Sequence, residues 1–195
     1  MTAPLTFRTL DASTWGDLER LFEARGGPSH CWCMVWRRTP EESHDSRPAS
    51  RKRMLSERVE AGVPLGIMAY RGDDPVGWCS VAPRDTLRAM GGPAAAEGER
   101  VWSIVCFFVP RPERGAGLMR GLVRAAIEHA EAHGATVVEA YPVDPDSPSY
   151  RFTGFAPTFR DMGFVEVGRA GTRRYVMRLT PTASSASGSS RATPG

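Results

Sequence analysis

The sequence predicts an α+β domain built on a mixed, mostly antiparallel sheet with helices packed against it. Residues 65–70 and 76–81 are apolar segments on either side of a Gly-Asp-Asp-Pro turn, the pattern of an antiparallel hairpin. A strand-like run over 101–109 is followed by a loop, an amphipathic helix and a second strand, which together form a βαβ unit. The 195 residues, of which 41% are hydrophobic, suffice for one domain with a core of its own.

The N-terminal part of the chain is expected to hold one strand and two helices. The strand covers 5–10. Apolar residues then recur with helical spacing over 15–22, with Ser13 or Thr14 as the helix cap. After an irregular segment rich in aromatic and sulfur side chains, a second helix is predicted over 48–60.

The centre of the chain carries the βαβ unit. The segment 84–100 is rich in Ala, Gly and Pro and is expected to be a loop with a short helical piece around 85–90. Residues 101–109 are β-branched and aromatic, as in a central strand covered on both faces. A helix beginning at Leu118 and a strand over 135–141 follow the loop after it.

The C-terminal part is expected to close the sheet. A short helix is predicted over 155–162, and the segments 163–167 and 174–179 have the pattern of a hairpin. Residues 180–195 consist almost entirely of Ser, Thr, Ala, Gly and Pro, and cannot bury enough apolar surface to order themselves. We therefore expect one domain over 1–179 and a disordered tail.

Charge and hydropathy exclude two classes of partner. The 25 Lys and Arg residues against 22 Asp and Glu leave a net charge of +3, too small an excess to indicate nucleic-acid binding. The longest apolar run, 104–109, is far shorter than the roughly 20 residues that span a bilayer, and residues 1–10 lack a signal-peptide core. We expect a cytoplasmic protein with neither a membrane nor a nucleic-acid partner.

The four cysteines are expected to be free thiols, because a core of this size in a reducing compartment needs no disulfide. They are Cys31, Cys33, Cys79 and Cys106. The His-Cys-Trp-Cys run that begins at His30 has neither the spacing nor the four ligands of a structural zinc site. No metal site is predicted, and these side chains are expected to form a polarisable wall.

The main functional motif is a glycine-rich loop between the buried strand and the amphipathic helix. It consists of Arg114, Gly115, Ala116, Gly117, Leu118, Met119 and Arg120. Such a loop presents free backbone amides and the positive end of a helix dipole, so it is suited to binding an anion. The alternative is that the glycines only make a tight turn. A Walker loop is excluded because no Lys follows the glycines, and the dinucleotide fingerprint lacks its third glycine, where Arg120 stands.

This arrangement resembles the GNAT superfamily of N-acetyltransferases, whose signature is Gln or Arg, two residues, Gly, one residue, then Gly or Ala. Arg114 and Gly117 match the signature, whereas Met119 departs from it. The Asp-Met-Gly-Phe segment ending at Phe164 is similar to a C-terminal turn of the family, and the order of elements also agrees. The Cys-Trp-Cys-Met and Glu-Ala-Tyr-Pro segments are similar to those of a bacterial subgroup.

The resemblance implies a GNAT fold, with a splayed pair of central strands, and acetyl transfer from acetyl-CoA to an amine within a ternary complex. The pyrophosphate would bind to the amides of 114–120. The pantetheine arm would pair with the edge of Phe107, Phe108 and Val109 like an extra strand. The expected acceptor is a primary amine of a small molecule. A protein or peptide amine, and an acyl-CoA sensor without activity, are the alternatives, and a homodimer is left open.

The catalytic acid and base are not at the family's usual positions. The position of the family's acidic Tyr is Phe159, and that of a common basic Glu is Ser103. Glu139 and Tyr141 alternate onto one face of the following strand and are predicted as base and acid. The alternative for Glu139 is an ion pair with an arginine of a neighbouring strand or of the C-terminal hairpin.

Three tryptophans are candidates for the wall of an acceptor pocket. They are Trp32, Trp36 and Trp78. Aromatic residues at such spacing are equally consistent with simple core packing, so both interpretations stay open.

Overall fold

A computed structural model describes residues 3–181 and contains one seven-stranded sheet in the order β1-β2-β3-β4-β5-β7-β6. The predicted tail therefore lies outside the described residues, apart from 180 and 181. The strands are β1 (Leu5–Thr9), β2 (Gly66–Arg71), β3 (Asp74–Pro83), β4 (Val101–Phe108), β5 (Val137–Ala140), β6 (Val165–Ala170) and β7 (Arg174–Leu179). The α-helices are α1 (Trp15–Glu23), α2 (Pro48–Glu60), α3 (Leu118–Ala132) and α4 (Ala156–Asp161).

The sheet is mixed, as predicted. Its neighbouring strands are antiparallel, except that β4 and β5 run parallel. Helix α3 connects this parallel pair, which confirms the βαβ unit, and the hairpin of β2 and β3 is also confirmed.

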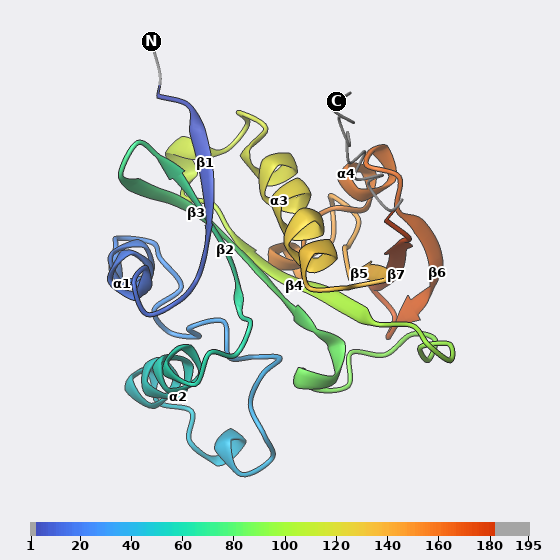
Figure 1. Ribbon diagram of the computed structural model, residues 1–195, viewed down its shortest axis with the longest axis horizontal. Coiled ribbons are helices and arrows are strands. Elements are labelled where there is room, and N and C mark those ends of the chain that lie inside the picture. Colours follow the sequence, from blue (N-terminus) through green and yellow to red (C-terminus); the bar gives the residue numbers. More distant parts are fainter. Residues whose placement is uncertain (1–2, 182–195) are drawn as a thin grey trace, which may run out of the picture.

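Helices cover both faces of the sheet (Figure 1). Strand β2 shows how the alternation of side chains divides the core. Ile67 and Ala69 belong to the apolar cluster that includes the buried face of α3. Met68 and Tyr70 point the other way, into a second cluster formed with α1, α2 and the segment after α1. The sheet is thus buried on both sides where β2, β3 and β4 run together.

The central strand β4 has a β-bulge in its pairing with β3, and its pairing with β5 ends early. Ser80 of β3 lies opposite Cys106, but Val81 lies opposite Ile104, so Val105 is an extra residue on β4. The pairing of β4 with β5 ends at Ile104 and Ala140. Beyond this point the last residues of β4 pair with β3 alone among the described strands, as expected for a splayed pair.

Several element bounds differ from the prediction. Strand β6 starts at Val165 and continues to Ala170, because it pairs with residues 174–178 of β7. In the loop after β3 the helical piece is a 3-10 turn over Arg84–Thr86. Thr14 is the N-cap of α1 by position, but its hydroxyl donates to the carbonyl of Thr9 at 3.0 Å instead of capping the helix. Within the described residues, no helix combines the length and apolar character needed to cross a membrane.

Candidate active site

A groove of about 850 Å³ runs along the start of α3 and the end of β4. All of the residues predicted to bind the cofactor line it, except Ala116. These residues are Phe107, Phe108, Val109, Arg114, Gly115, Gly117, Leu118, Met119 and Arg120. Sequence reasoning missed the opposite wall, which comes from the segment 26–30 and from residues 151–158. No sequence motif marks either segment, and only the fold brings the two segments to the groove.

The glycine loop has the geometry of an anion-binding turn. Gly115 and Gly117 have φ of +84° and +77°, in the left-handed region that favours glycine, and a Cβ at either position would meet no atom within 4 Å. Gly117 is the N-cap of α3 and has no side chain to bond the first-turn N–H groups. These donors therefore face open space at the positive end of a helix, where they suit a phosphate. The residues present thus fit the pyrophosphate of coenzyme A.

The arginines of this loop are partly held by the protein. Arg114 donates its Nε to the carbonyl oxygen of Val109 at 2.9 Å, which ties the loop back to the end of β4. Arg120 forms an ion pair with Asp161 of α4. Both residues stay exposed, so their guanidinium groups can add positive charge beside the backbone amides of the loop.

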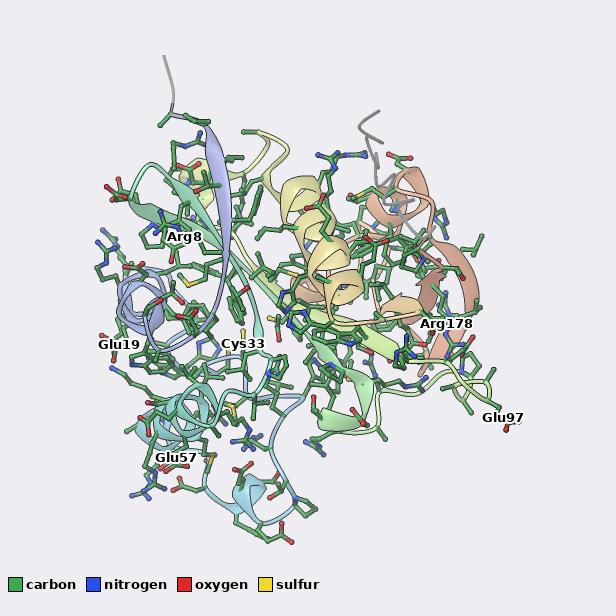
Figure 2. All side chains as sticks on the ribbon, in the orientation of Figure 1. Arg8, Glu19, Cys33, Glu57, Glu97 and Arg178 are labelled. Atoms are coloured by element: carbon green, nitrogen blue, oxygen red, sulfur yellow. The ribbon has the colours of Figure 1, made fainter. Side chains whose placement is uncertain are left out.

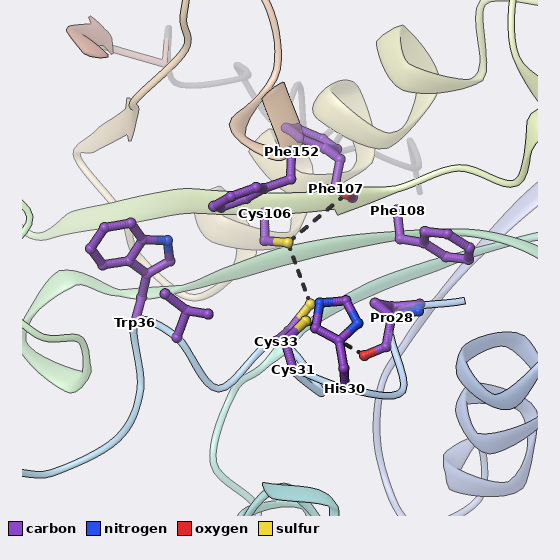
Figure 3. Close-up of a pocket in the computed structure, with 10 residues that line it drawn as sticks. Pro28, His30, Cys31, Cys33, Trp36, Cys106, Phe107, Phe108 and Phe152 are labelled. Carbon is purple, nitrogen blue, oxygen red and sulfur yellow. Dashed lines mark hydrogen bonds between the residues drawn. The ribbon is translucent and has the colours of Figure 1, made fainter. Parts of the chain in front are cut away.

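A second cavity, of about 200 Å³, adjoins the groove, and Figure 3 shows the residues that line it. It shares Phe107, Phe108 and Phe152 with the groove, together with Pro28 and His30. Its remaining lining residues are Cys31, Cys33, Val35, Trp36 and Cys106. The cavity is therefore mostly apolar, and it begins where the groove meets the unpaired end of β4.

Its sulfur atoms form a packed wall. Cys33 donates to Cys106 Sγ across 3.4 Å, and Trp78 donates its Nε1 to Cys33 Sγ at 3.1 Å. The hydrogen bond to Cys106 and burial raise the pKa of the Cys33 thiol. All four cysteines are free thiols. Among residues 3–181, no three His, Cys, Asp or Glu side chains come together as metal ligands.

Only one of the three predicted tryptophans, Trp36, lines this cavity. The prediction is wrong for Trp32 and Trp78, which are 2% and 0% exposed and belong to the core. Trp32 stacks on Trp15 with ring centroids 5.8 Å apart, and Phe22 lies between the two buried indoles as a shared neighbour. These rings are buried because α1 closes over the segment that carries Trp32.

Glu139 and Tyr141 lie together, but inside the sheet. Both are fully buried, and the Tyr141 hydroxyl donates to Glu139 Oε1. Burial and the adjacent carboxylate raise the pKa of Tyr141, so the phenol stays protonated. The other carboxylate oxygen accepts from Arg178 Nε at 2.7 Å and from Arg84 Nη1 at 3.5 Å. Neither Glu139 nor Tyr141 lines the groove or the cavity.

These contacts match the alternative interpretation of Glu139 as an ion-paired carboxylate. Figure 2 shows Arg178 among the side chains at the end of the sheet that carries β5 to β7. Its partner, Glu139, lies directly opposite on β5. Whether Glu139 and Tyr141 also act in catalysis stays a prediction.

The residues at the family's usual acid and base positions, Phe159 and Ser103, are both buried. Phe159 packs against Phe107 and Phe164, with ring centroids 6.2 and 5.2 Å away, and has no exposed surface. Ser103 is also fully buried, and its hydroxyl has no hydrogen-bond partner among the described residues. Phe159 supplies no proton, because its ring carries no ionisable group.

The chain matches a protein-family model and shares its fold with solved acetyltransferases. The model described as the acetyltransferase (GNAT) family matches residues 29–155. A search of curated proteins finds no match.

Three solved structures illustrate the shared fold. The ribosomal-protein-alanine N-acetyltransferase of Brucella melitensis is 21% identical with a TM-score of 0.56, and the match covers 90% of this chain and 99% of that one. The ribosomal-protein-S5-alanine acetyltransferase of Vibrio fischeri is 12% identical with a TM-score of 0.56, covering 90% and 92%. The PaiA N-acetyltransferase of Thermoplasma acidophilum, solved with coenzyme A, is 12% identical with a TM-score of 0.55, covering 91% and 99%.

Proposed function

Because this chain belongs to the acetyltransferase (GNAT) family and uses acetyl-CoA as its acetyl donor, we propose that it acetylates the primary amine of a small molecule. Transfer would be direct, within a ternary complex of donor, acceptor and protein. The observation that carries the proposal is the continuity of the two cavities: a groove with free amides opens into a small apolar chamber at the end of β4.

The chain's own residues would position the donor. The first-turn amides of α3, reached through Gly115 and Gly117, would bind the pyrophosphate. Phe107, Phe108 and Val109 line the groove at the splay, and there the backbone of β4 would pair with the pantetheine amides. In the transfer, the amine nitrogen would bond to the acetyl carbon of the thioester, the C–S bond would break, and coenzyme A would leave as its thiolate. We propose that a backbone N–H of β4 beside the bulge would stabilise the oxyanion.

The small chamber supports a small acceptor. Its volume of about 200 Å³ and its Phe, Trp and Cys lining suit a compact molecule, held with its amine toward Phe107. The competing acceptor is the N-terminal amine of a protein, since two of the structures that share the fold are named as ribosomal-protein-alanine acetyltransferases.

The reaction needs a group that accepts the proton of the attacking amine. A neutral amine held at the thioester attacks without further activation, so the main requirement is a route for its proton. His30 lines both the groove and the chamber, and we assign it as the group that takes this proton through water. The buried Glu139 and Tyr141 would then stabilise the sheet beside the splay. The prediction that they act as base and acid can be tested by mutation of Glu139.

Two measurements test the proposal in sequence. Excess acetyl-CoA at about 100 times its dissociation constant should stabilise the protein by roughly 2.7 kcal/mol and raise its Tm by about 5 to 10 °C. Incubation of the protein with labelled acetyl-CoA and a cell lysate should then label small molecules rather than proteins, as read by mass spectrometry. Label found only on protein N-termini would favour the competing acceptor. Binding of acetyl-CoA without consumption over a broad amine panel would favour a sensor.

A further inference from the structure

Arg174, the first residue of β7, lies among three aromatic rings. Its Cζ is 4.7 Å from the ring centroid of Trp36, 5.1 Å from that of Tyr150 and 5.8 Å from that of Tyr141. The rings of Trp36 and Tyr150 are themselves stacked, with centroids 6.5 Å apart. A guanidinium in such surroundings is attracted to the ring faces but loses much of its hydration.

The protein leaves part of this cation without a partner. Nη2 donates to the carbonyl oxygen of Met90 at 3.3 Å, whereas Nη1 is buried and has no acceptor among the described residues. No carboxylate of residues 3–181 forms an ion pair with Arg174, and burial lowers its pKa. The indole Nε1 of Trp36 is likewise buried and unpartnered. An unsatisfied buried donor is destabilising, and native structures rarely contain two of them side by side unless a ligand or water completes them.

Trp36 lies at one end of the acceptor chamber, and Arg174, which does not line the chamber itself, packs against the Trp36 ring. Trp36 lines the chamber, and Figure 3 shows its indole nitrogen on the side of the ring nearer Cys106. Phe152 lines the same chamber and contacts Tyr150, with ring centroids 6.1 Å apart. Tyr150 is the exposed member of the aromatic group, at 38%, so its ring can move aside from Arg174 without unpacking the core.

We propose that the acceptor amine carries a carboxylate, which accepts hydrogen bonds from Arg174 Nη1 and Trp36 Nε1. The inference rests on the proposed function and specifies its substrate class: small amino acids. The carboxylate occupies the Trp36 end of the chamber and the amine faces Phe107, where the groove enters. A carboxylate satisfies both orphaned donors at once and neutralises a cation that the chain leaves unpaired.

The test uses matched pairs of small amines that differ only at the anionic group. Amino acids of several chain lengths are compared with their carboxamides, and with phosphorylated amines of similar size, by following coenzyme A release. In the wild-type protein the acids should exceed the amides at least tenfold in kcat/KM, through KM rather than kcat. Arg174→Met should abolish this preference, and Trp36→Phe, which keeps the ring and removes the N–H, should reduce it.

Two controls separate recognition from folding. Arg169→Met removes a similar arginine, whose Cζ lies 3.9 Å from the Tyr175 ring on the exposed surface, and should leave the preference unchanged. Arg174→Lys keeps the cation and should retain part of the preference even if the Met variant folds poorly. Equal rates for acids and amides in the wild type, a preference for phosphate, or a preference that survives Arg174→Met would overturn the inference.

A binding experiment separates this inference from the proposed function. If no amine of the panel is acetylated, N-acetylated acids and their amides are titrated into the protein saturated with coenzyme A. Tighter binding of the acids, lost in Arg174→Met, supports the carboxylate site without any turnover. Equal binding refutes it. Failure of acetyl-CoA to raise the Tm refutes the donor groove instead.

Discussion

Arg178 and Glu139 face each other across β7 and β5, and the Arg178 Nε donates to Glu139 Oε2 at 2.7 Å. The carboxylate is fully buried, and the arginine side chain is 13% exposed. Arg178 also donates its Nη2 to the carbonyl oxygen of Pro93 at 3.0 Å, so one guanidinium links the sheet to the loop before β4. The pair therefore stabilises the sheet beside the splay of β4 and β5.

Removing one partner should leave a buried charge. We expect Arg178→Met to lower the free energy of unfolding by about 3 kcal/mol, because the buried Glu139 then keeps the Tyr141 hydroxyl but only the longer of its two ionic contacts, that with Arg84. This corresponds to a Tm lower by about 6 to 12 °C in a calorimetric scan. Arg20→Met is the control: its pair with Asp17 is on the surface, and its loss should cost under about 1 kcal/mol. Equal Tm shifts for the two variants would contradict the stabilising role of the ion pair between Arg178 and Glu139.

The pairing register of β5 and β7, which sets Arg178 opposite Glu139, could not be predicted from the sequence. Period-2 alternation placed Glu139 and Tyr141 on one face of a strand, and their contact agrees with it. Which arginine lies opposite depends on the pairing of strands 39 residues apart. The bulge at Val105 is similar, because an unpaired residue is visible only after β3 and β4 are aligned.

The assignment of the catalytic base to Glu139 and its assignment to His30 predict opposite effects of mutation. If His30 takes the proton of the amine, His30→Gln should lower kcat about tenfold or more. Glu139→Gln should change kcat little once assays are run below its lowered Tm. A large loss of kcat in Glu139→Gln with an unchanged Tm, and an unchanged kcat in His30→Gln, would instead assign the base to Glu139.

The glycine loop can be tested with a matched pair of glycines. We expect Gly117→Glu to weaken acetyl-CoA binding at least tenfold, measured by titration calorimetry, because it places an anionic side chain where the phosphates would bind. Gly171→Glu is the control: Gly171 also has positive φ, +71°, and open space around its Cβ, but it lies in the turn between β6 and β7. Equal affinity of Gly117→Glu and the wild type would remove the proposed phosphate site.

The groove was more predictable than the chamber for a physical reason. The loop of 114–120 follows a buried strand and begins a helix, so its local sequence already determines where its amides point. The chamber is assembled from three distant segments that meet at Cys106, Phe152 and Trp36. Aromatic spacing in the irregular segment before α2 does not distinguish Trp36 from the buried Trp32, since only packing against α1 decides which ring faces the core.

Helix α3 carries a histidine whose protonation opposes folding. Burial, and less strongly His133, lower the pKa of His129 from 6.5 to about 4, and its Nε2 is buried without a partner among the described residues. Below pH 6.5 the unfolded chain binds a proton that the folded protein accepts only near pH 4. The free energy of unfolding should therefore decrease as the pH drops from 6.5 towards 4. His129→Phe keeps a ring against Trp102 and should flatten the decline in urea titrations at pH 7, 5.5 and 4. The control is His133→Gln, at an exposed residue one turn further along α3. It should leave most of the decline in stability, because burial is the larger cause of the lowered pKa of His129. An unchanged decline in His129→Phe would exclude His129 as its source.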